Sequence, residues 1–128
     1  MKSTQEQFLE TARKLFADRG FYGVSIANVA DQHGLTKQAV LHHFPTKEKL
    51  YGEVLKEIAT ELHAAVQSAE ANTDDPRERL IQLLVSMLPT TEDEVVRTRI
   101  LTRELLDNKI RGTNGIGLVF ETVLERAR

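Results

Sequence analysis

The residues SIANVADQHGLTKQAVLHHF, at positions 25–44, decide the fold of this chain. Ser25 and Thr36 are residue types that favour the N-cap of a helix, and each precedes a short run with apolar residues at helical spacing. Gly34 lies between the two runs, and Pro45 follows the second. Because glycine permits a tight turn and proline cannot continue a helix, the stretch predicts two short helices joined by a turn, the helix-turn-helix arrangement.

The packing of the two predicted helices follows from their small and apolar residues. Ala30 is expected where the helices cross closely, because its small side chain lets the backbones approach. Val29, Leu35 and Val40 are expected to pack the seam between them. This packing would leave the polar face of the second helix, at about residues 36–44, exposed to solvent.

Lys37 and Gln38 lie in the first turn of that second helix and are expected on its outer face. An α-helix fits the major groove of DNA, where glutamine can bind the edge of adenine and lysine can donate to guanine. Many helical corners share this spacing without touching DNA, and lysine and glutamine are common surface residues. The spacing alone therefore leaves both DNA binding and a plain structural corner open.

The rest of the chain is also predicted to be helical. The expected helices span residues 4–19, 47–71, 76–88 and 91–106, each starting at a capping residue and ending near glycine, proline or a polar break. No segment alternates with the period of a strand, so the predicted fold class is all-α. The apolar residues of the last two helices are interpreted first as ordinary core: Leu80, Leu83, Leu84, Met87, Leu88, Ile100, Leu101, Leu105 and Leu106.

The composition excludes several classes of protein. The 128 residues include no cysteine, which removes disulfides, thiolate metal sites and cysteine nucleophiles. The N-terminus is too acidic for a secretory signal, and no run reaches the ~18 apolar residues of a membrane span. We therefore expect a soluble, cytoplasmic protein with no membrane partner.

Candidate catalytic and metal-binding sets are weak. His42 and His43 are adjacent rather than one helical turn apart, which disfavours a shared metal ion. No carboxylate pair or nucleophile–base arrangement stands out. The sequence therefore predicts no enzymatic activity, no metal and no cofactor.

Residues 11–55, TARKLFADRGFYGVSIANVADQHGLTKQAVLHHFPTKEKLYGEVL, resemble the N-terminal domain of TetR-family transcriptional repressors. The matching features are LFADRGF at the end of the first helix, IANVADQHGLTK across the turn, and HHFPTKEKL at the start of the fourth helix. One position departs from the family, which usually has tyrosine where this chain has Leu41. The hydroxyl that often reaches a phosphate is thereby lost.

The resemblance implies DNA contacts for eight residues: Ser25, Thr36, Lys37, Gln38, Leu41, His42, His43 and Lys47. The two N-cap residues would present hydroxyl and N–H groups to phosphates, and the lysine and glutamine that follow would read bases. Leu41 would make an apolar contact, such as one to a thymine methyl group. The histidines and Lys47 would lie against the phosphate backbone, although His43 equally fits a boundary position of the core and Lys47 an exposed helix charge.

The resemblance also implies a division of the chain. Residues 1–46 would form the DNA-binding domain, residues 47–71 a connecting helix, and residues 72–128 a helical effector-binding and dimerisation domain. The chain is short for the family, so either it is a reduced member or this last domain is incomplete; the second alternative would place a gap around residues 109–117.

The function implied is that of a ligand-responsive transcriptional repressor. It would bind a palindromic operator in double-stranded DNA as a homodimer and respond to a small-molecule effector. Arg97, Arg99 and Arg103 could bind an acidic effector, but their pattern favours a solvated helix face with ion pairs at i, i+4 spacing. The alternative function is a helical protein-interaction module that keeps the helix-turn-helix as a scaffold without binding DNA.

Overall fold

The computed structural model describes residues 1–111, with side chains up to Asp107. These residues confirm the all-α prediction and include no strand. The helices are α1 (Thr4–Arg19), α2 (Ile26–Gln32), α3 (Lys37–His43), α4 (Lys47–Asn72), α5 (Pro76–Ser86) and α6 (Glu92–Arg111). The sixth helix continues past its expected end at residue 106, and the gap expected around 109–117 falls mostly outside the described residues.

Local signals set the beginnings and ends of the short helices. The Ser25 hydroxyl accepts from the Asn28 N–H at 3.1 Å, and the Asn28 side chain accepts from the Ser25 N–H at 2.9 Å. This reciprocal capping box fixes the start of α2 more firmly than the single N-cap that the sequence predicts. Gly20 ends α1 with a φ of 76°, in the region that favours glycine.

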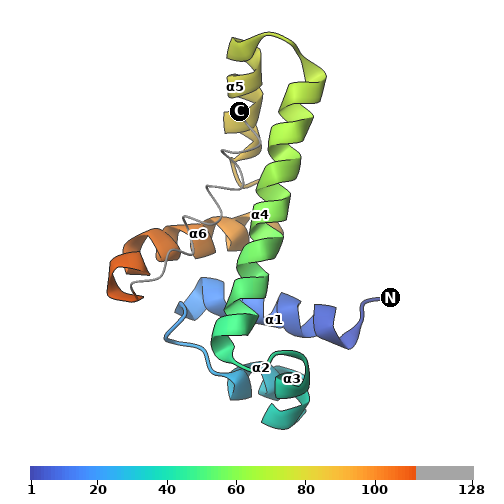
Figure 1. Ribbon diagram of the computed structural model, residues 1–128, viewed down its shortest axis with the longest axis vertical. Helices are drawn as coiled ribbons and strands as arrows, with labels where there is room; N and C mark the ends of the chain where they lie inside the picture. Colours follow the sequence, from blue (N-terminus) through green and yellow to red (C-terminus); the bar gives the residue numbers. More distant parts are fainter. Residues whose placement is uncertain (112–128) are drawn as a thin grey trace.

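The long helix α4 organises the molecule (Figure 1). Helices α1, α2 and α3 gather around its N-terminal end, while α5 returns beside its C-terminal half. Helix α6 packs across α1 near the lower half of α4. Within residues 1–111, no helix combines the length and the apolar content needed to cross a bilayer.

One hydrophobic core joins α1, α2, α3 and α4, and α6 contributes to it. The apolar stripe predicted for α4 is buried throughout, which confirms that part of the sequence analysis. The largest fully buried apolar side chains of this core are Phe8, Phe16, Phe44, Leu50, Ile58 and Ile100. The helix-turn-helix is therefore held on α4 by packing rather than by the turn alone.

The apolar residues of α5 and the end of α6 are mostly not core. Leu80, Leu84 and Leu88 are 57%, 59% and 62% exposed, and α5 has no buried residue. Leu105 and Leu106 are also exposed, whereas Ile100 is buried as predicted. Helical spacing predicts an apolar face but not what covers it, so the expectation of a core was wrong for most of these positions.

Candidate nucleic-acid interface

The turn between α2 and α3 depends on Gly34. Its φ is 64°, and its N–H donates to the carbonyl of Asp31 at 3.2 Å. The N–H of Leu35 returns to the carbonyl of Ala30 at 3.0 Å, and Ala30 is buried as predicted. Leu35 itself is 45% exposed, so its expected place in the seam was wrong. Its side chain leaves the turn on the side that faces solvent.

Helix α3 exposes the two side chains predicted to read bases. Lys37 and Gln38 are exposed, while Val40 is fully buried and holds the opposite face of the helix in the core. Neither the lysine nor the glutamine side chain has a polar partner among residues 1–107. Both are therefore available to a ligand outside the chain.

The two N-cap residues of the turn differ. Ser25 and Thr36 are both exposed, but only the Ser25 hydroxyl accepts a hydrogen bond from its own helix. Thr36 stands at the N-cap position of α3, as predicted, without a side-chain capping bond. Its hydroxyl therefore remains free for another acceptor or donor.

The three remaining residues of α3 lie at different depths. Leu41 is half-buried against the core, and His42 is exposed. His43 is half-buried, with its ring edge-on to Phe8 at 5.7 Å between centroids. His33, which the sequence analysis did not single out, packs edge-on to the same ring at 5.1 Å between centroids and forms a hydrogen bond with the Thr11 hydroxyl at 2.8 Å.

Lys47, at the start of α4, is held by the loop that follows α1. Its Nζ donates to the carbonyl oxygen of Phe21 at 2.9 Å and lies 4.2 Å from the centroid of the Phe21 ring. Tyr22, which is 60% exposed, has its ring centroid 5.9 Å from the same nitrogen. The sequence predicted neither partner, because the contact joins positions 26 residues apart.

The arginines of α6 pair with other helices rather than along their own. Arg97 is buried and lies 3.8 Å from Glu61 of α4, and Arg99 lies 3.2 Å from Asp18 of α1. Arg103 donates to the carbonyl oxygens at the end of α1. The expected i, i+4 pairs were wrong for these three residues, because their partners lie on α1 and α4.

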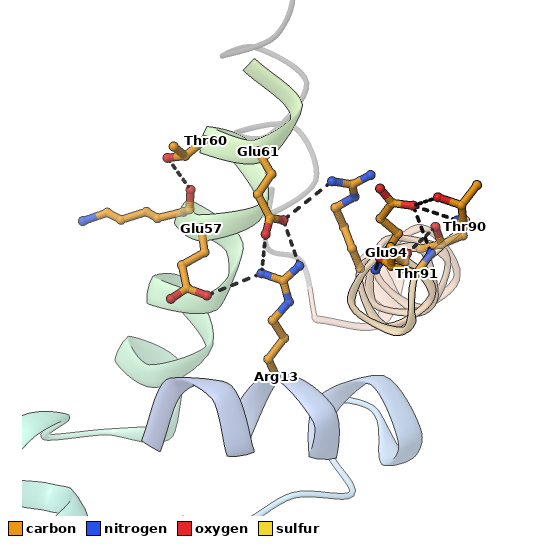
Figure 2. Close-up of polar contacts among 10 residues, drawn as sticks. Arg13, Glu57, Thr60, Glu61, Thr90, Thr91 and Glu94 are labelled. Carbon is orange, nitrogen blue, oxygen red and sulfur yellow. Dashed lines mark hydrogen bonds and ion pairs between the residues drawn. The ribbon is translucent and has the colours of Figure 1, made fainter. Parts of the chain in front are cut away.

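Arg13 of α1 is the centre of a network of charged side chains that also includes Glu57 and Glu61 of α4 and Arg97 of α6 (Figure 2). It forms two hydrogen bonds to Glu61, at 3.0 and 2.8 Å, and a longer one to Glu57 at 3.5 Å. Burial alone would lower the pKa of Arg13, but the hydrogen bonds and charges of the two glutamates outweigh it and raise the pKa. At Glu57, burial raises the pKa more than Arg13 lowers it.

The part of the chain that the structure describes has no cluster of three or more side chains suited to a metal ion. An acidic cleft of about 400 Å³ between α1 and α4 includes Glu57 and Glu61, whose carboxylates already face Arg13. An apolar groove lies between α4 and α5. Neither is adjacent to the exposed face of α3.

Residues 8–54 match the sequence model described as "Bacterial regulatory proteins, tetR family". Over these residues the chain is similar to the N-terminal domain of TetR-family regulators. That family consists of transcriptional regulators and not of enzymes, in agreement with the sequence analysis. The matched residues include all of α2 and α3, their N-cap residues and the start of α4, and therefore all eight candidate DNA contacts.

TetR-family relatives include repressors and activators. The chain is 29% identical over 90 residues to the "HTH-type transcriptional repressor KstR2" of Mycolicibacterium smegmatis, covering 70% of this chain and 44% of the relative. It is 35% identical over 74 residues to the "HTH-type transcriptional activator FasR" of the same organism, covering 58% and 34%. The chain thus spans less than half the length of these curated relatives.

A solved structure shares the fold over a longer stretch than these sequence matches. The ketosteroid transcriptional regulator KstR2 of Mycobacterium tuberculosis superposes with a TM-score of 0.81 at 23% identity, covering 98% of this chain and 63% of that chain. At this identity the similarity shows the fold alone. The helical arrangement of α4, α5 and α6 is therefore one that a TetR-family protein adopts.

Proposed function

We propose that this chain binds duplex DNA and regulates transcription, with α3 as its recognition helix. The observation that carries the proposal is the division of α3 into two faces. Val40 anchors one face in the core, while Lys37 and Gln38 on the other have no polar partner within residues 1–107. Glutamine and lysine are among the side chains that contact base edges in the major groove.

The phosphate contacts are proposed for residues around α3. The exposed hydroxyls of Ser25 and Thr36, the exposed ring of His42 and the ammonium of Lys47 would position the helix on the backbone. His43 and Leu41 are half-buried, so their contacts would be made by the exposed part of each side chain. Lys37 and Gln38 would then supply the sequence preference.

The oligomer and the regulation are also proposals. We infer a homodimer that binds a palindromic operator, because two copies of one recognition helix match two half-sites about one helical turn apart. Repression is favoured by the similarity to the repressor KstR2, although FasR is named an activator. A small-molecule effector would release DNA only by binding the non-binding conformation more tightly.

The domain division proposed is 1–46 for DNA binding, 47–71 for the connecting helix and 72–128 for effector binding and dimerisation. Its support is that α4 begins at Lys47 and ends at Asn72. Helix α6 nonetheless contacts α1 directly, so the last region is placed where it can influence the first.

Selection from a pool of duplexes with a random central region, repeated at two salt concentrations, tests the function. We expect enrichment of an inverted repeat and an affinity that falls steeply with salt, as counterion release requires. Enrichment of a single half-site would support DNA binding but contradict the dimer. Retention with no enriched sequence at either salt concentration would contradict the proposal and favour a helix-turn-helix kept as a protein-interaction scaffold.

A further inference from the structure

We propose that α6 positions Lys47 for the DNA backbone through three consecutive contacts: Lys47 to Phe21, Phe21 to Tyr51, and Tyr51 to Glu104. The inference rests on the proposed function and deepens it, because it adds positioning residues that lie away from the DNA-binding face. It makes Glu104, on the last described helix, part of the machinery that orders a phosphate contact.

The first contact restrains the lysine before DNA arrives. The Lys47 ammonium donates to the Phe21 carbonyl at 2.9 Å and lies 4.2 Å from the ring centroid. An ammonium has three N–H donors, so two remain for a phosphate oxygen. A restrained lysine loses less side-chain entropy on binding than a free one. The position of Phe21 therefore determines where the Lys47 ammonium lies and how much side-chain entropy Lys47 loses when it binds a phosphate.

The second contact ties Phe21 to the core. Its ring meets the edge of Tyr51 with 5.1 Å between centroids, and Tyr51 meets Phe16 in the same way at 4.9 Å. Tyr51 is 7% exposed, whereas Phe21 lies only partly buried at the surface of the core. The buried tyrosine thus fixes the less buried phenylalanine.

The third contact comes from α6. The Tyr51 hydroxyl donates to Oε2 of Glu104, whose side chain is buried with 1% exposure. A hydrogen bond to a carboxylate in a buried site is stronger than one between neutral groups, so it holds the tilt of the tyrosine ring. Helix α6, which lies away from the proposed DNA-binding face, thereby determines the geometry of the contact between the Tyr51 and Phe21 rings.

A second attachment places α6 at the same loop. Arg103 donates from Nε to the carbonyl of Ala17 at 2.8 Å and from Nη2 to the carbonyl of Asp18 at 2.7 Å. These carbonyls end α1, immediately before the loop that contains Phe21. A displacement of α6 would therefore move Glu104, at one end of the three contacts, and also the loop that brings Phe21 to Lys47. Helix α6 would do this without touching DNA.

The test uses the full chain and begins without DNA. The ε-methylene protons of Lys47 should resonate upfield of those of the other lysines, because the adjoining Nζ lies over the Phe21 ring. Lys47→Met assigns the signal by removing it. In Tyr51→Phe, which keeps the ring and removes the hydroxyl, we expect this upfield shift to be reduced. Tyr22→Phe is the matched control, because Tyr22 is 60% exposed and its hydroxyl has no partner among the described residues.

A second variant breaks the same contact from the other side. Glu104→Leu removes the acceptor while keeping a buried side chain of similar size, so it avoids an unpaired buried charge. It should reduce the Lys47 shift as Tyr51→Phe does, and the double variant should show no further change. An unchanged Lys47 shift in whichever of the two variants retains a folded amide spectrum would overturn the inference.

DNA binding separates this inference from the proposed function. On one fixed duplex, the slope of log affinity against log salt should fall by about 1 in Lys47→Met, and by less in Tyr51→Phe. Once Lys47 has been replaced, Tyr51→Phe should have no further effect on that slope. If the Lys47 signal moves as expected but neither variant changes the slope, the positioning stands and the phosphate role of Lys47 is wrong.

Discussion

Under the proposed function, Gln38 carries sequence specificity without contributing to the stability of the fold. Its side chain is exposed and has no polar partner within residues 1–107, while the backbone that presents it is held by Val40 beneath. Substitution at this position should therefore alter contacts to an external ligand and leave the fold intact.

Gln38→Ala should change which bases are preferred in a selected duplex. Losing a bidentate glutamine–adenine contact costs about 1–3 kcal/mol of discrimination at one base pair, with little change in affinity for unrelated sequences. Competition between the preferred duplex and single-base variants measures this loss. Gln67→Ala, at an exposed position of α4, is the matched control and should leave the preference unchanged. Unchanged discrimination in Gln38→Ala would remove this residue from base reading.

At the scale of elements, the turn between α2 and α3 rests on backbone conformation rather than on side-chain space. A Cβ added at Gly34 would meet no atom within 4 Å, so only the φ of 64° opposes substitution. Gly52, within α4, is equally open and has no such conformation. These two glycines form a natural pair for comparing the two contributions.

Gly34→Ala should lower the free energy of unfolding by about 1–2 kcal/mol, because a left-handed residue with a Cβ is strained. Gly52→Ala should raise it by about 0.5–1 kcal/mol, because alanine restricts the unfolded chain and favours a helix. Urea denaturation measures both. If the two variants changed stability in the same direction, backbone conformation would not be what distinguishes the two sites.

The side chain of Glu94 caps the start of α6. The Glu94 carboxylate accepts from the N–H and hydroxyl of Thr90 at 2.7 and 2.9 Å and from the N–H of Thr91 at 3.3 Å. The Glu94 N–H donates back to the Thr91 hydroxyl at 3.2 Å, so the two residues form a reciprocal capping box. These bonds, led by that from the Thr90 N–H, lower the pKa of Glu94 below its usual 4.5.

A lowered carboxyl pKa stabilises the folded state above the unfolded-state value, and this contribution is lost as pH falls through the folded-state pKa. As the pH is lowered from about 6 through 4.5 to 3, the unfolding midpoint should therefore fall more in the wild type than in Glu94→Gln. Glu92→Gln, in the same first turn, should follow the wild type. Equal pH dependence in the wild type and Glu94→Gln would contradict this role for the cap.

At the scale of the whole molecule, charged contacts join α1 to α4 and α4 to α6. Arg13 of α1 pairs with Glu61 of α4, which lies 3.8 Å from Arg97 of α6. The Arg13 side chain is only 11% exposed, whereas Glu57 and Glu61 are 41% and 38% exposed. The pairs are therefore partly screened by solvent but more ordered than a surface ion pair.

Arg13→Met should lower the free energy of unfolding by about 1–3 kcal/mol, less than at a fully buried pair, because the glutamates retain contact with water. Lys56→Met is the control: Lys56 pairs with Glu53 at 3.3 Å with 69% exposure, and its loss should change stability by less than about 0.5 kcal/mol. Urea denaturation compares them. Equal effects would show that the network adds no more than an ordinary surface pair.

The sequence by itself determined the helix-turn-helix and the elements around it. Capping residues, Gly20, Gly34 and Pro45 mark where helices begin and end, and these signals act within a few residues of chain. The apolar period of α4 likewise predicted its buried stripe, because a helix bearing one continuous apolar face must bury that face. The exposed positions of Lys37 and Gln38 followed from the same periodicity.

Only the tertiary structure decided how these elements are fastened together. The bonds from Arg99 and Arg103 to α1 span more than 80 residues of sequence, and periodicity along α6 could not reveal them. Periodicity likewise could not predict the hydrogen bond from Lys47 to Phe21, the exposure of Leu35 or the exposed apolar face of α5. Local patterns fix which face of a helix is apolar or charged, but the partner of that face is set by where distant helices pack.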